Sequence, residues 1–141
     1  MYAGEKAPQS LRGGLAVAVP GELAGLHAAW LRHGRLPWSR LVEPVAQLAG
    51  GFRVDAKLAR AIADSAPHMG AAMLAVFAPG GRPLAEGELC ANTALQKTLR
   101  RVAAKGPSEF YSGDLAAAMA AAAQSQVSWS EADFAGALCR N

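Results

Sequence analysis

The stretch that decides the fold covers residues 13–59 and reads GGLAVAVPGELAGLHAAWLRHGRLPWSRLVEPVAQLAGGFRVDAKLA. Its first apolar run, residues 15–19, lies between Gly14 and Pro20 and predicts a short buried strand. The backbone N–H and C=O groups of one strand need partners from another, and no second convincing strand follows soon. We therefore expect the rest of that sheet to lie outside this chain.

A helix is predicted directly after this strand. In Pro20-Gly21-Glu22 the proline presets a helical φ and the acid lies in the first turn, so a helix is expected to run to about His33. Apolar side chains recur in it at helical spacing, those of Leu23, Leu26, Trp30 and Leu31. Gly34 is expected to close this helix in a left-handed conformation.

Two further helices complete this region. Pro37 is predicted to begin the first, Gly50-Gly51 to end it, and Pro44 to kink it. One face of that helix carries aliphatic side chains, those of Leu41, Val45 and Leu48. The next helix is predicted over residues 55–65, with an apolar stripe that contains Leu58 and Ile62.

The second half of the chain is predicted to alternate between loops and helices. Residues 66–89 hold several prolines and glycines and are expected to form a loop with a small hairpin. Asn92 or Thr93 is expected to cap a helix that Gly106-Pro107 breaks. The apolar residues of that helix are Leu95, Leu99 and Val102.

An alanine-rich helix and a last short helix are predicted after this break. The turn at residues 112–114 is expected to begin the alanine-rich helix, which runs to about Ser125. Ser130 is expected to cap the last helix, with Asp133 in its first turn. Because alanine supplies much of the 52% hydrophobic content and aromatics only 6%, we expect tight packing between small side chains.

The charge pattern argues against a nucleic-acid-binding protein. The net charge is +3, but the basic residues are scattered rather than gathered on one face. Charged residues make up 18%, below the usual quarter, which suggests that parts of the surface are meant to be covered. No run approaches the apolar length that spans a bilayer, and residues 1–10 lack the apolar centre of a secretory signal. The chain is therefore expected to be cytosolic or a piece whose targeting segment lies elsewhere.

The residues with reactive or metal-binding side chains do not form a recognisable site. His27 and His33 lie six residues apart, so they do not share a helix face as a metal pair would. The sequence next to His68 shows no obvious residue for acid–base chemistry. Two cysteines, Cys90 and Cys139, are too few for a disulfide framework or a thiolate metal site. No phosphate loop and no nucleophile elbow occurs. No catalytic residue, metal or cofactor is therefore predicted, and the tryptophans are interpreted as packing anchors.

The order of residues in 13–59 resembles the large-subunit segment of the γ-glutamyltranspeptidases, also called glutathione hydrolases. The run Ala24-Gly25-Leu26-His27 with Trp30 is most similar to plant and algal members. The positions that carry the resemblance in the first half are Gly14, Val17, Val19, Pro20, Gly21, Glu22, Gly25, Gly34, Arg35, Leu36, Pro37, Trp38, Leu41, Pro44, Leu48, Ala49, Gly51, Phe52 and Val54. Those in the second half are Gly106, Phe110, Tyr111 and Gly113, then Ser130 and Asp133.

The resemblance implies a mainly α fold with one short strand, taken from the large subunit of an αββα N-terminal-nucleophile hydrolase, with residues 1–141 as one partial large-subunit region. It implies a self-cleaving enzyme in which a threonine at the new N-terminus attacks the γ-glutamyl amide of glutathione. That threonine is expected outside this chain. The implied partners are glutathione, other γ-glutamyl compounds and the small subunit of the same precursor, with no nucleic acid and no metal. The implied location is membrane-associated, extracellular or vacuolar.

The chain also departs from the family pattern. The family has an arginine directly before a Glu-x-Ala-Pro motif, and this arginine grips the substrate's α-carboxylate. Here Glu5-Lys6-Ala7-Pro8 fits the motif, but Gly4 precedes it and has no charged side chain. Other departures are one residue missing between Ala49 and Phe52, Gln126 and Val127 in place of paired glycines, and Ala137 in place of a tyrosine. The alternative to an enzyme fragment is a degenerate, non-catalytic helical module that binds a partner.

Overall fold

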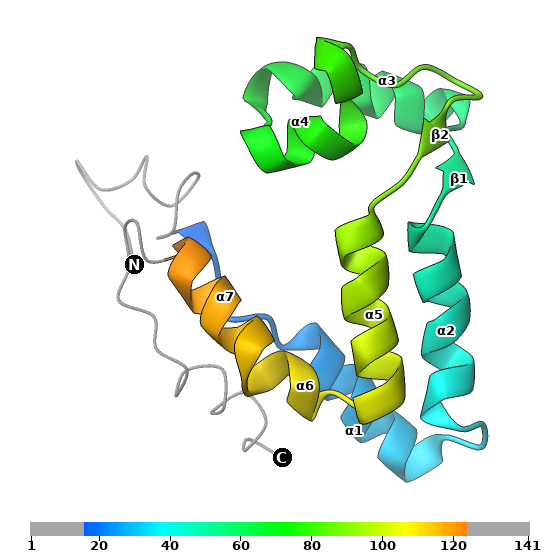
Figure 1. The fold of residues 1–141 in the computed structure, drawn as a ribbon. Helices are drawn as coiled ribbons and strands as arrows, with labels where there is room; N and C mark the ends of the chain where they lie inside the picture. Colours follow the sequence, from blue (N-terminus) through cyan, green and yellow to red (C-terminus); the bar gives the residue numbers. More distant parts are fainter. Residues whose placement is uncertain (1–15, 124–141) are drawn as a thin grey trace. The chain divides into compact units, whose positions relative to one another are not determined.

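The computed structural model describes residues 16–123, whose helices and strands are drawn in Figure 1. Internal contacts divide the chain into two compact units, one formed by Met1–Trp38 with Arg101–Asn141 and the other by Ser39–Arg100. The long helices α2 (Trp38–Ala49) and α5 (Thr93–Lys105) contribute residues to both units. Within residues 16–123, every helix is too short or too polar to cross a bilayer.

The first unit packs its helices around small side chains. It contains α1 (Glu22–His33), α6 (Ser108–Tyr111) and α7 (Asp114–Ala123). Its buried residues are Ala24, Tyr111, Ala116 and Ala120, and partly buried Val19, Leu23, Phe110 and Met119 pack against them. Because three of the four buried residues are alanines, the predicted packing of small side chains is confirmed here.

The second unit combines short helices with a two-stranded sheet. It contains most of α2, then β1 (Phe52–Arg53), α3 (Ala56–Ser65), η3 (Ala66–His68), α4 (Ala71–Phe77), η4 (Pro79–Gly81), β2 (Leu89–Cys90) and the first part of α5. β1 and β2 are antiparallel, with Phe52 opposite Cys90. The core consists of Val54, Ile62, Leu84 and Cys90, with Phe52, Leu58, Ala59, Val76 and Phe77 packed against it.

The predicted strand at residues 15–19 is wrong for the residues that the structure describes. Ala16 lies in a 3₁₀ turn, residues 17–20 are irregular, and Val17 is 51% exposed. The sheet of the described chain lies instead at β1 and β2, two-residue strands too short to give an apolar alternation in the sequence. The prediction of a mainly helical fold is nevertheless confirmed.

The ends of the first three helices follow the glycine and proline pattern closely. α1 ends at His33 as predicted, but Gly34 is extended, with φ −68° and ψ 139°, so the predicted left-handed cap is wrong. A side chain at Gly34 would collide with the ring and backbone of Trp30, and this close approach is why a glycine fits here. Pro44 lies inside α2, which continues to Ala49. Asp55 caps α3, because its Oδ1 accepts a hydrogen bond from the Leu58 N–H at 2.7 Å.

In residues 66–89 the predicted loop is only partly correct. This segment contains α4 and two short 3₁₀ turns, and Val76 and Phe77 anchor α4 in the core. Pro67 lies inside η3 and Pro79 begins η4, so these prolines belong to 3₁₀ turns rather than to one continuous loop. The predicted hairpin is also wrong, because β2 pairs with β1 from outside the segment.

The caps and breaks of the later helices agree with the sequence pattern. Asn92 caps α5, because its Oδ1 accepts a hydrogen bond from the Leu95 N–H at 2.9 Å. Gly106 then ends α5 with a positive φ of 83°, and Gly113 precedes α7 with a φ of 90°. The one-turn helix α6 between these glycines was not predicted. The end of the alanine-rich helix near Ser125 and the last helix at Ser130 and Asp133 lie outside the described residues.

Candidate functional site

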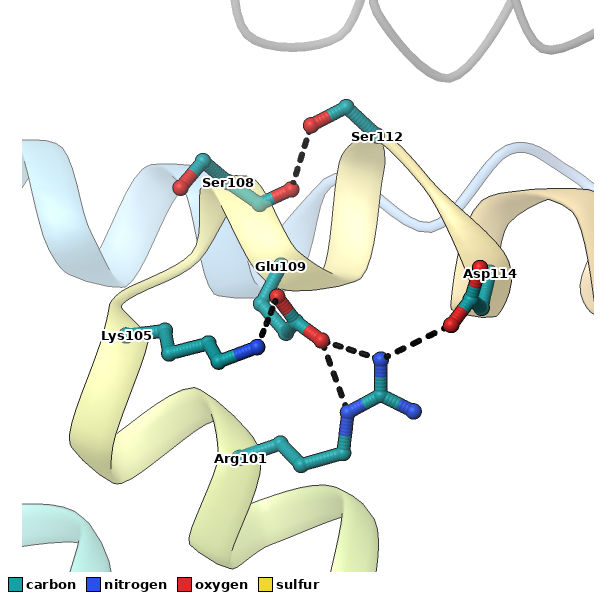
Figure 2. A network of polar contacts seen from close by, with 6 residues as sticks. All are labelled: Arg101, Lys105, Ser108, Glu109, Ser112 and Asp114. Atoms are coloured by element: carbon teal, nitrogen blue, oxygen red, sulfur yellow. Dashed lines mark hydrogen bonds and ion pairs between the residues drawn. The ribbon is translucent and has the colours of Figure 1, made fainter.

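The densest group of charged side chains in the described residues lies where α5, α6 and α7 follow one another. Figure 2 shows Glu109 of α6 between two basic side chains of α5. Arg101 donates to Glu109 Oε1 through Nε at 2.7 Å and also through Nη2, while Lys105 Nζ lies 3.4 Å from Glu109 Oε2. On the other side, Arg101 Nη2 lies 3.7 Å from Asp114 Oδ2 of α7.

The electrostatics of this group favour a structural role. The Glu109 side chain is only 15% exposed, and the hydrogen bond from Arg101 lowers the pKa of its carboxyl group, with further help from the charge of Lys105. A carboxylate stabilised in this way is a weak base and accepts protons poorly. The contacts of Glu109 link the end of α5 to α6 across the Gly106 turn. Directly after α6, Ser112 Oγ donates to Ser108 O at 2.7 Å.

A second cluster contains the aromatic residues of α1 and the start of α2. His27 stacks on Trp30 with ring centroids 5.2 Å apart and meets Trp38 edge-on at 5.0 Å. The indole N–H of Trp30 donates to Leu36 O at 2.8 Å, and that of Trp38 donates to Val102 O at 3.0 Å. Both indoles therefore use their polar group within the fold, in agreement with their interpretation as packing anchors. Trp129 lies outside the described residues.

Tyr111 has the most specific hydrogen bond in the first unit. Its side chain is fully buried, and its hydroxyl oxygen accepts a hydrogen bond from the Ala24 N–H at 3.0 Å. The first N–H groups of any helix lack partners inside that helix, and Gly21 supplies no side chain to cap α1. The hydroxyl oxygen of Tyr111, which belongs to α6, therefore provides the hydrogen-bond acceptor for an otherwise unpaired N–H group at the start of α1. Burial raises the pKa of the Tyr111 hydroxyl.

The remaining candidate residues do not converge on a reactive centre. Cys90 is buried, and burial raises the pKa of its thiol, which lowers its nucleophilicity. His68 lies in η3, and no group of three His, Cys, Asp or Glu side chains within residues 16–123 could hold a metal ion. An open hollow on α3 is lined by Ala56, Lys57, Arg60, Ala61 and Asp64. All of these come from one helix, so the hollow cannot enclose a ligand.

The contacts around Glu109 and the hydrogen bond of Tyr111 were not predicted from the sequence. Lys105 and Glu109 have the i, i+4 spacing of a helical ion pair, but Gly106-Pro107 lies between them and concealed that signal. Nothing in the sequence pairs Tyr111 with Ala24, which is 87 residues away. Several residues named in the sequence-based predictions lie outside the described residues: Gly4, Glu5, Gln126, Val127, Ala137 and Cys139.

Comparison with known proteins identifies the family. The family model for Gamma-glutamyltranspeptidase matches residues 1–138. The chain is 41% identical over 116 residues to Glutathione hydrolase 3 of Arabidopsis thaliana, covering 80% of this chain and 18% of that protein. It is also 41% identical over 114 residues to Glutathione hydrolase 7 of Homo sapiens, covering 79% of this chain and 17% of that protein. The matched region thus spans less than a fifth of the length of these relatives.

Solved structures agree with this result. The Helicobacter pylori γ-glutamyltranspeptidase has a TM-score of 0.85 and 25% identity, with 92% of this chain and 38% of that chain covered. The transpeptidase CapD of Bacillus anthracis has a TM-score of 0.78 and 31% identity, with 85% of this chain and 42% of that chain covered. Sequence, family model and fold point to the same group of enzymes, and the chain belongs to the γ-glutamyltranspeptidase family.

Proposed function

We propose that residues 1–141 are one partial region of the large subunit of a glutathione hydrolase, and that they act as scaffold rather than as catalyst. The whole enzyme cleaves the γ-glutamyl amide of glutathione and passes the γ-glutamyl group to water or to an acceptor amine. The family match over residues 1–138 and the names of the curated relatives support this activity.

One observation carries the scaffold role. Among the described residues, the polar side chains of Glu109, Arg101 and Tyr111 use their contacts to join helices to one another. A nucleophilic centre instead needs a hydroxyl, thiol or amine next to a base, with donors that stabilise an oxyanion. Within residues 16–123 the buried thiol of Cys90 is the nucleophile of highest intrinsic reactivity, and its raised pKa opposes that use.

In the proposed whole enzyme, the reactive groups come from outside this chain. The threonine hydroxyl of the small subunit attacks the γ-glutamyl carbonyl, and the threonine's own α-amino group accepts the proton. The amine leaves with a proton, and a γ-glutamyl ester of the threonine remains. Water or an acceptor amine then attacks the ester and regenerates the threonine. We also propose a membrane-associated, extracellular or vacuolar location, which the family resemblance alone suggests.

A chimera tests this function. Residues 1–138 of this chain replace the matching segment of Glutathione hydrolase 3 of A. thaliana, and release of the anilide from a chromogenic γ-glutamyl anilide is measured. The isolated chain is expected to give no turnover. The chimera with Gly4→Arg is expected to turn over, and the same chimera without its nucleophilic threonine is the control. Turnover by the isolated chain, or a folded but inactive Gly4→Arg chimera, would contradict the proposal.

The chimera that keeps Gly4 isolates the contribution of the missing arginine. Loss of a bidentate contact to a carboxylate is expected to raise KM about tenfold or more relative to the Gly4→Arg chimera. Equal KM values in the two chimeras would mean that this position does not grip the substrate.

A further inference from the structure

We draw no further inference here: the strongest candidate, the side-chain cluster of His27, Trp30 and Trp38 at α1 and the start of α2, belongs to the packing already described, because its three rings contact one another and both indole N–H groups donate to backbone carbonyl oxygens.

Discussion

Replacing Tyr111 by phenylalanine tests the link between α6 and the start of α1. The substitution keeps the ring in the core formed with Ala24, Ala116 and Ala120 and removes only the hydroxyl group. The Ala24 N–H then loses the acceptor that lies 3.0 Å away, and Ala24 is only 7% exposed, so water cannot easily replace it. Leaving a buried donor without a partner costs about 1–3 kcal/mol.

We expect Tyr111→Phe to lower the free energy of unfolding by about 1–2 kcal/mol, since a nearby helix end can relax slightly toward water. For a chain of this length that corresponds to a fall in Tm of roughly 3–8 °C. Urea unfolding followed by far-UV circular dichroism measures the difference. Tyr111→Ala, which also empties the space of the ring, is expected to cost about 3–5 kcal/mol and separates the hydrogen bond from the packing.

Alkaline pH provides an independent readout of the same residue. Because burial raises the pKa of the Tyr111 hydroxyl, the unfolded chain releases its proton at a lower pH than the folded chain does. The stability that the neutral Tyr111 hydroxyl contributes is fully present below the pKa of an unfolded tyrosine, about 10, and is lost as the pH rises above that value. Tyr111→Phe should remove this part of the alkaline destabilisation. A stability change below about 0.5 kcal/mol together with an unchanged alkaline slope would refute the reasoning.

Three other predictions concern single positions. The hydrogen bond from Arg101 lowers the pKa of the Glu109 carboxyl group in the folded chain, so the ionised carboxylate stabilises the fold above the pKa of an unfolded glutamate. This stabilisation is lost as the pH falls through the pKa that Glu109 has in the folded chain. Glu109→Gln should therefore make the free energy of unfolding fall less steeply toward acid pH, as urea titrations at a series of pH values measure. Because Cys90 is buried, it should react with a thiol reagent only when the chain unfolds. Labelling a Cys139→Ser variant, in which Cys90 is the remaining thiol, measures this, and rapid labelling of the folded variant would contradict the burial. Gly106 has a positive φ, so Gly106→Ala should lower the free energy of unfolding by about 1–2 kcal/mol. Gly25 lies inside α1 with open space around it, so Gly25→Ala should raise the free energy of unfolding by about 0.5–1 kcal/mol. Equal shifts in Tm for the two variants would contradict both expectations.

The helices were predictable to the extent that their ends carry local signals. Asn92, Gly106 and Gly113 act within a few residues of their own positions, so their effects can be read from a single sequence. The strand at residues 15–19 could not be judged in this way, because strand formation depends on a partner elsewhere in the chain. The same reason explains the missed strands β1 and β2, which are defined by pairing rather than by composition.

The candidate site was less predictable than the fold. The contacts of Glu109 cross a helix break, and Tyr111 meets a backbone group 87 residues away, so neither has a local pattern. In α2, the pattern correctly placed Leu41, Val45 and Leu48 on one face. It could not tell whether that face is covered, because coverage is a property of the neighbouring polypeptide. The family, by contrast, was evident from the order of glycines, prolines and tryptophans.

The alanines of α7 have a consequence for how such sequences diverge. Ala116 and Ala120 are buried beside Ala24 and Tyr111, yet each methyl group contributes only about 0.8 kcal/mol of burial. These two positions therefore require a small side chain, since a valine there would push the neighbouring backbones apart. Over evolutionary time, exchange among glycine, alanine and serine should be accepted at these two sites, while branched aliphatic residues should be eliminated.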